Sequence, residues 1–220
     1  MTALMVWMQP WFAAAFTAWG VPFTWLEIVA VVLSVAMVVC NMRVNPLAWP
    51  LAIAASLLYF ALFWNSKLYG DASLQIFFVA ISVWGWREWL RGTAANGQAL
   101  QVQTLGRQGR VIALLIVLIS WPAVGWFLKT YTDTDVPWWD AFPTAASIVG
   151  QWLLARKYLE NWATWVVVNV VSVALFAYKG LWLTAALYAV FVLMSVAGWR
   201  AWQRLLVPLQ TLPQPPPKTR

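Results

Sequence analysis

The sequence contains no histidine and only one cysteine, Cys40, among its 220 residues. These absences exclude a metal site built on His or Cys ligands, a Cys–His nucleophile pair and an intrachain disulfide. Carboxylates are also scarce, and Glu27 and Asp140, near the ends of apolar segments, are the only candidates for acid–base chemistry within them. A Gly-x-x-x-x-Gly-Lys phosphate loop is missing, so this chain does not itself use ATP. We predict that the protein is not an enzyme and requires no cofactor.

Charge of either sign is rare as well. Charged residues make up 10% of the chain and hydrophobic residues 63%, whereas typical soluble domains carry about 25% charged residues. The apolar residues form unbroken blocks, such as 28–40 and 111–118, rather than the stripes of amphipathic helices. No basic residue precedes Arg43, so the basic start of a signal peptide is lacking and we expect the N-terminus to be retained. The composition predicts an all-α integral membrane protein.

Seven segments have the roughly 20 apolar residues that a membrane-spanning helix needs. We place them at 23–42, 46–65, 71–90, 109–129, 138–158, 161–179 and 181–203. Residues 1–20 are apolar but are interrupted by Pro10 and Gly20, which favours an in-plane helix on the outer surface over an eighth span. The proline-rich residues 208–220 are expected to form a disordered cytoplasmic tail.

The basic residues are distributed unequally between the two ends of these spans. Seven crossings put eleven Lys and Arg residues on one side and three, Lys67, Lys129 and Lys179, on the other. The positive-inside rule therefore predicts an external N-terminus and a cytoplasmic C-terminus. The net charge of +7 is thus explained by topology and does not indicate nucleic-acid binding. We expect a multi-pass protein of the bacterial inner membrane.

The chain also resembles itself. Asn45 and Trp49 recur 116 residues later, and Gly85-Trp86-Arg87-Glu88-Trp89 matches Gly198-Trp199-Arg200-Ala201-Trp202 at an interval of 113, with three extra loop residues placed in the first half. Residues 23–90 and 138–203 are then two three-helix repeats joined by a linker helix at 109–129. A single linker helix makes both repeats enter the membrane from the same side, which predicts a 3+1+3 parallel repeat.

Polar residues within the spans are the candidates for a binding site, because polar groups facing lipid are unfavourable. Asn161, Trp165 and Asn169 follow helical spacing and share one face. Small Ser residues fit helix packing better than ligand binding. We assign most tryptophans to the interfacial belt, including Trp86, Trp89, Trp138, Trp139, Trp199 and Trp202. The predicted binding residues are Trp165, Asn169, Gln151, Gln75, Tyr188, Asn161, Trp49, Asn45 and Thr184.

The stretch from Asn161-Trp162 through Trp165, then Phe176 to Leu181 and Thr184 to Tyr188, ends in Gly198-Trp199-Arg200-Ala201-Trp202. This combination resembles the PnuC family of vitamin transporters over nearly the whole chain. The resemblance implies a SWEET-like fold, a homotrimer and uptake of nicotinamide riboside by facilitated diffusion. It also implies trapping of the substrate by a cytoplasmic riboside kinase, as a step of NAD biosynthesis.

The candidate residues suit such a substrate. Nicotinamide riboside has a cationic aromatic ring, a carboxamide and a sugar, which call for aromatic walls and amide partners. A relative of the same family carries thiamine, whose cationic ring would also suit Trp and Tyr, so thiamine is an alternative substrate. A membrane scaffold or assembly subunit is an alternative of another class.

Overall fold

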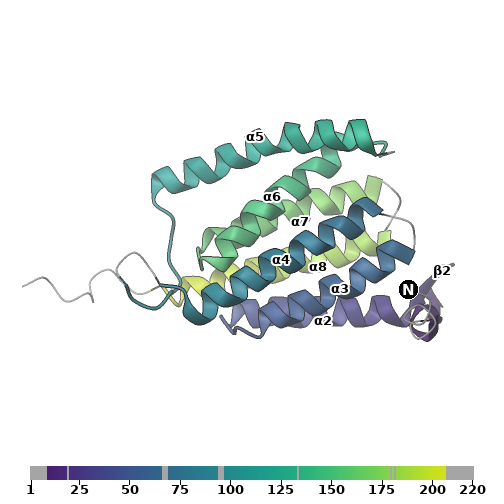
Figure 1. Ribbon diagram of the computed structural model, residues 1–220, viewed down its shortest axis with the longest axis horizontal. Helices are drawn as coiled ribbons and strands as arrows, with labels where there is room; N and C mark the ends of the chain where they lie inside the picture. Colours follow the sequence, from purple (N-terminus) through teal and green to yellow (C-terminus); the bar gives the residue numbers. More distant parts are fainter. Residues whose placement is uncertain are drawn as a thin grey trace, which may run out of the picture.

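The computed structural model describes residues 9–18, 20–65, 69–93, 97–132, 134–178, 180 and 182–206, and this part of the chain holds seven long helices (Figure 1). In chain order they are α2 (Trp25–Met42), α3 (Ala48–Asn65), α4 (Tyr69–Arg91), α5 (Arg107–Tyr131), α6 (Pro137–Ala155), α7 (Glu160–Tyr178) and α8 (Trp182–Gln203). The seven predicted segments are thus helices, with ends close to the predicted ones.

Five of these helices are long and apolar enough to cross a membrane, namely α2, α3, α5, α7 and α8. The other two, α4 and α6, pack between them. The protein is therefore an all-α membrane protein, as the composition predicts. Figure 1 shows the helices lying side by side as one elongated bundle.

Six of the helices form a closed ring. The contacts run from α2 to α3, α4, α6, α7 and α8, and α8 packs against α2 again. The remaining long helix, α5, packs against α6 on the outside of the ring, at the top edge of the view in Figure 1. Its outer face is exposed and apolar, with Ile119 70% exposed, which suits contact with lipid. Each three-helix unit therefore supplies half of the ring.

Helices α2 and α6 end in the same way. Each is closed by a Schellman motif, in which Val44 and Lys157 take the left-handed conformation with φ of 52° and 55°. Asn45 N–H then bonds to the carbonyl of Cys40, and Tyr158 N–H to that of Leu153, both at 2.9 Å. The prediction that the span beginning at residue 138 continues to residue 158 is wrong, because α6 ends at Ala155 and the chain reverses at Lys157. Glycine usually occupies the left-handed position at such a helix end, and here it is absent.

The contacts of the two units recur at one interval of 113 residues. The two helix ends just described are one example. The packing of Trp49 on Gly85 and of Trp162 on Gly198 is another. The earlier match of Asn45 and Trp49 with residues 116 positions later is therefore wrong, since the structural counterpart of Trp49 is Trp162. No extra loop residues are needed in the first half to align the described contacts.

The segment before α2 differs from the prediction. Gln9–Phe12 forms a short 3-10 helix, η1, and Ala14–Ala18 (β1) pairs antiparallel with Val21–Thr24 (β2). An in-plane helix over residues 1–20 is thus wrong for 9–18. The turn at Gly20, with φ of 79°, lets the chain reverse and pair with itself. Residues 1–8 and the predicted tail 208–220 lie outside the described residues.

The candidate binding site in the helix ring

Four tryptophan side chains meet inside the ring at the end where α2, α4, α6 and α8 finish. Trp49, Trp89, Trp162 and Trp202 are all at most 6% exposed. The contacts run from Trp49 to Trp89, on to Trp202 and then to Trp162, with ring centroids 5.5, 6.2 and 5.6 Å apart. Because α4 and α8 are not neighbours in the ring, the Trp89–Trp202 contact crosses its interior. These four residues, here called the tryptophan plug, close the ring at this end.

The plug depends on two glycines. A Cβ atom at Gly85 would overlap the Trp49 indole, and one at Gly198 would overlap the Trp162 indole. Only glycine lets each indole approach the neighbouring helix this closely. Within each unit the two tryptophans of the plug meet edge to face: Trp49 and Trp89 at 85°, and Trp162 and Trp202 at 88°. This geometry is favourable for aromatic pairs.

The two inner tryptophans also join the units to each other. Trp89 Nε1 donates to the carbonyl of Leu154 at 3.1 Å, and Trp202 Nε1 donates to the carbonyl of Asn41 at 2.9 Å. Both acceptors lie in the last turn of a helix, where each carbonyl also accepts the N–H of the left-handed residue that ends the helix, Lys157 for Leu154 and Val44 for Asn41, both at 3.0 Å. The first bond links α4 to α6 and the second links α8 to α2. We call these two contacts the α4–α6 seam and the α2–α8 seam.

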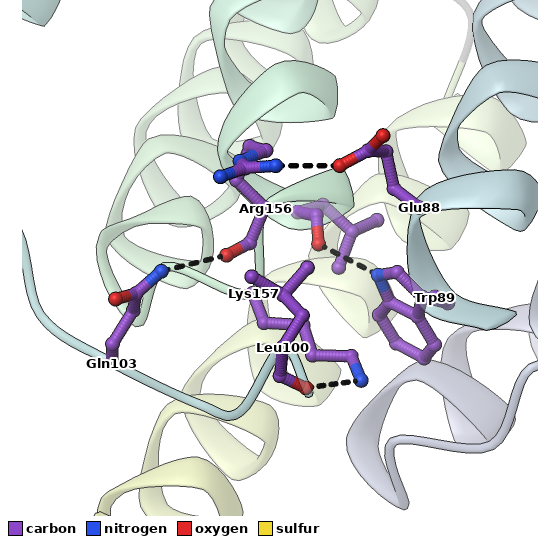
Figure 2. Close-up of polar contacts among 7 residues, drawn as sticks. Glu88, Trp89, Leu100, Gln103, Arg156 and Lys157 are labelled. Atoms are coloured by element: carbon purple, nitrogen blue, oxygen red, sulfur yellow. Dashed lines mark hydrogen bonds and ion pairs between the residues drawn. The ribbon is translucent and has the colours of Figure 1, made fainter. Parts of the chain in front are cut away.

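The α4–α6 seam carries further polar contacts, which Figure 2 shows. Arg156 forms a 2.5 Å ion pair with Glu88. The Lys157 ammonium donates to the carbonyl of Leu100 at 2.8 Å and lies 5.1 Å from the centre of the Trp89 ring. Gln103 Nε2 donates to the carbonyl of Arg156 at 3.3 Å. Burial lowers the pKa of Lys157 from its ordinary value, because the charged form loses hydration. The chain between α4 and α5 is thus bound to the α6–α7 turn.

Of the predicted site residues, the amides of the second unit are buried inside the bundle. Asn169 Nδ2 donates to Ser195 Oγ at 3.2 Å, which joins α7 to α8, and Ser195 donates onward to the Phe191 carbonyl. Gln151 on α6 is 7% exposed. Asn161 is fully buried and donates to the Tyr158 carbonyl at 2.6 Å, while its Oδ1 has no partner among the described residues. These groups can still accept or exchange hydrogen bonds with a ligand.

The other predicted residues lie in several different surroundings. Trp49 belongs to the plug, and its Nε1 has no partner in the described part of the chain. Trp165 is half-buried and packs on the apolar core between α5, α6 and α7. Asn45 accepts a hydrogen bond from the Leu47 N–H at 2.9 Å and so shapes the turn before α3. Tyr188 packs against Phe176, with ring centroids 5.0 Å apart and the rings tilted by 34°. Gln75 on α4 and Thr184 on α8 are half-buried.

The prediction that Trp89 and Trp202 belong to the interfacial belt is wrong, since both are buried in the plug. Composition could not distinguish them from Trp86, which is 38% exposed and lies three residues before Trp89 in α4. The signal that could have found them is the glycine four residues earlier, Gly85 or Gly198, which marks the buried face of each helix. Trp162 was missed because the wrong interval paired Trp49 with Trp165.

Two surface grooves lie away from these residues. One, of about 420 Å³, is lined by Val136, Trp139, Ala174, Leu175 and Tyr178. The other lies between α7 and α8 and is lined by valine, alanine and leucine only. Both linings are almost wholly apolar and neither contains a predicted site residue. They suit lipid chains better than a polar solute.

Comparison with known proteins supplies relatives along nearly the whole chain. The family model described as nicotinamide mononucleotide transporter matches residues 24–204. The nicotinamide riboside transporter PnuC of Escherichia coli is 28% identical over 66% of this chain and 71% of its own length. The riboflavin/roseoflavin transporter RibM of Streptomyces davaonensis is also 28% identical, over 86% and 89%. A crystal structure of the vitamin B3 transporter PnuC matches with a TM-score of 0.66 and 24% identity, over 82% of this chain and 81% of that one.

Proposed function

Because this chain belongs to the nicotinamide mononucleotide transporter family, we propose that it carries nicotinamide riboside across the bacterial inner membrane by facilitated diffusion. It is a multi-pass membrane protein and a vitamin transporter of this family, not an enzyme. The specific substrate and the mechanism are the proposal.

The single observation that carries the substrate assignment is the buried amides of the second unit. Asn169 and Gln151 are 6% and 7% exposed, and each brings an amide with two donors and an acceptor into an apolar interior, where one Asn169 donor is engaged by Ser195. A carboxamide has the same donor and acceptor pattern and can exchange hydrogen bonds with such groups. Aromatic side chains can hold the cationic ring by stacking and cation–π contact. The proposed site is centred on Asn169 and Gln151. The other residues that we assign to the pathway, which lie in several different surroundings, are Trp165, Gln75, Tyr188, Asn161, Trp49, Asn45 and Thr184.

Riboflavin is the second candidate substrate. The riboflavin/roseoflavin transporter RibM is as similar in identity as the E. coli nicotinamide riboside transporter and aligns over more of the chain. Its named substrate also contains a ring with adjacent carbonyl and N–H groups, which amides can bind. Thiamine, the alternative from the sequence, lacks both a carboxamide and such an imide, so the buried amides favour it least.

Calorimetric titration of the purified protein with the three vitamins tests this assignment. We expect saturable heat with nicotinamide riboside and none with thiamine. Uptake into proteoliposomes without any ion gradient should follow the same order, because facilitated diffusion needs only a substrate gradient. Binding of riboflavin alone would move the assignment to the second candidate. A strict requirement for a proton or sodium gradient would contradict facilitated diffusion.

The proposal also covers the assembly, the orientation and the metabolic partner of the transporter. We propose a homotrimer with a pathway through each ring, a cytoplasmic C-terminus, and substrate trapping by a cytoplasmic riboside kinase. The eleven-to-three distribution of basic residues supports the orientation. In a Cys40-free protein, a cysteine at Thr134 should react with an impermeant reagent from outside. Native mass spectrometry that finds only monomers in mild detergent would contradict the trimer.

A further inference from the structure

The two seams share one kind of hydrogen bond but differ in the number of further polar contacts. In each, an indole N–H from the last turns of one unit bonds to a carbonyl at the end of a helix of the other unit. These two bonds lie at the same end of the bundle, which carries Arg43, Arg91, Arg156 and Arg200 and is here called the arginine-rich end. Only at the α4–α6 seam do the described contacts add an ion pair, a lysine and the chain between α4 and α5.

The sequence itself explains the inequality. At the interval of 113 residues, the counterpart of Glu88 is Ala201, so the α2–α8 seam lacks the carboxylate that pairs with Arg156. The counterpart of Arg156 is Arg43, whose side chain is exposed. The counterpart of Lys157 is Val44, which has neither a charge nor a donor in its side chain. The α2–α8 seam therefore depends on one indole–carbonyl bond and on packing.

Backbone strain also falls on this weaker seam. Val44 has φ of 52°, a conformation that is unfavourable for a β-branched residue by about 1–3 kcal/mol. Lys157 has the same conformation, but its side chain is fixed by the Leu100 carbonyl and the Trp89 ring. Val44 packs against the apolar cluster around the tryptophan plug, but its side chain can form no hydrogen bond or ion pair to fix the turn. A strained backbone held by packing alone is suited to a segment that alternates between two conformations.

We propose that the arginine-rich end opens by parting of the α2–α8 seam, while the α4–α6 seam stays joined and serves as the hinge. A closed ring can release a solute only if contacts between its two halves break. The tryptophan plug then divides between Trp89 and Trp202, the pair with the longest centroid distance, 6.2 Å. The proposal requires that the chain be a transporter but does not depend on which vitamin it carries.

Matched cross-links distinguish the two seams. In a Cys40→Ala background whose uptake is first verified, one variant carries Glu88→Cys with Arg156→Cys and the other Ala201→Cys with Arg43→Cys. A short bis-thiosulfonate reagent joins each pair, and a reducing agent releases it. We expect the 43–201 cross-link to reduce uptake at least tenfold and the reducing agent to restore it. The 88–156 cross-link should leave at least half of the uptake. Block by both cross-links, by 88–156 alone, or by neither would overturn the proposal.

A distance measurement makes the test independent of the substrate. Spin labels at the same two pairs of sites, in lipid nanodiscs, report the separation of each seam. The 43–201 pair should give a broad or double distance distribution and the 88–156 pair a single narrow one. The reverse pattern, or two identical distributions, would overturn the proposal. If uptake of nicotinamide riboside failed while these distributions held, only the substrate assignment would fall.

A third test adds an ion pair to the α2–α8 seam. Ala201→Glu puts a carboxylate opposite Arg43 and so copies the Glu88–Arg156 pair onto the weaker seam. We expect uptake to fall by about threefold to fivefold, the effect of a partly exposed ion pair that favours the closed state. Ala201→Gln, with the same size and no charge, should transport normally, and Arg43→Gln should restore the Ala201→Glu variant. Equal loss in the Glu and Gln variants would count against the proposal.

Discussion

The two three-helix units share a backbone plan but differ in what they bury. At matching positions, the second unit has Gln151, Asn161 and Asn169, where the first has Val38, Ala48 and Ser56. The plug, in contrast, draws two buried tryptophans from each unit. The two units thus contribute equally to the plug, whereas three of the buried amides, those that we propose as partners of the solute, lie in the second unit and one, Asn41, lies in the first.

The largest expected effect tests whether the two units contribute equally to the stability of the tryptophan plug. Trp49→Ala and Trp162→Ala should each lower the free energy of unfolding by about 3–5 kcal/mol, because each leaves a cavity between packed helices. Thermal unfolding in one detergent measures both. Trp139→Ala, at a side chain 57% exposed, is the control and should change little. A loss in one unit more than twice that in the other would show that the plug is not shared equally.

The next effect tests whether the amides of the second unit contribute more to ligand binding than the matching residues of the first unit. Asn169→Leu should weaken binding of nicotinamide riboside by about 1–3 kcal/mol, roughly five- to 150-fold, because the ligand group loses its partner. Ser56→Ala, at the matching position of the first unit, should change affinity less than twofold. Calorimetric titration measures both, with expression and oligomer size as checks on folding. Equal losses would mean that both units bind the solute.

A smaller effect compares the ends of α2 and α6. Val44→Gly should stabilise the protein by about 1 kcal/mol, since glycine relieves the strain at φ of 52°. Lys157→Gly removes the same strain but also the hydrogen bond to Leu100 and the contact with Trp89, so it should destabilise by a similar amount. Thermal unfolding decides the signs. Stabilisation by both substitutions would show that the lysine contacts contribute nothing.

The smallest effect is the pH dependence that Lys157 adds. Burial lowers its pKa in the folded protein below the ordinary value near 10.5, so the unfolded chain binds more protons between the two values. Stability therefore rises with pH in this window and is unaffected well below it. Lys157→Met should remove this rise, whereas Val44→Met, at the matching position, should keep it. Unfolding midpoints measured from pH 7 to 10.5 test the difference.

Long apolar blocks made the seven helices predictable, because length and composition suffice to find a span. The end of α6 was not predictable, since Lys157 and Val44 take a conformation that sequence usually reserves for glycine. Among the site residues, burial of Asn169 and Asn161 agrees with the single polar face seen in the sequence, but their role in binding stays a prediction. The glycines four residues before Trp89 and Trp202 mark the buried face of each helix, but the carbonyls that these two indoles bond to lie in the opposite unit, which local pattern does not report.

The chain between α4 and α5 has a consequence for how the protein is made. Leu100 and Leu105 find their partners in Lys157 and Glu160, 57 and 55 residues further along the chain. At about 5–20 residues per second, ribosomes need roughly 3 to 11 seconds to reach those partners. During that interval α5 and α6 must enter the bilayer before the preceding loop has anything to bind. The α6–α7 turn is thus the point in synthesis at which the first half of the protein becomes fastened to the second.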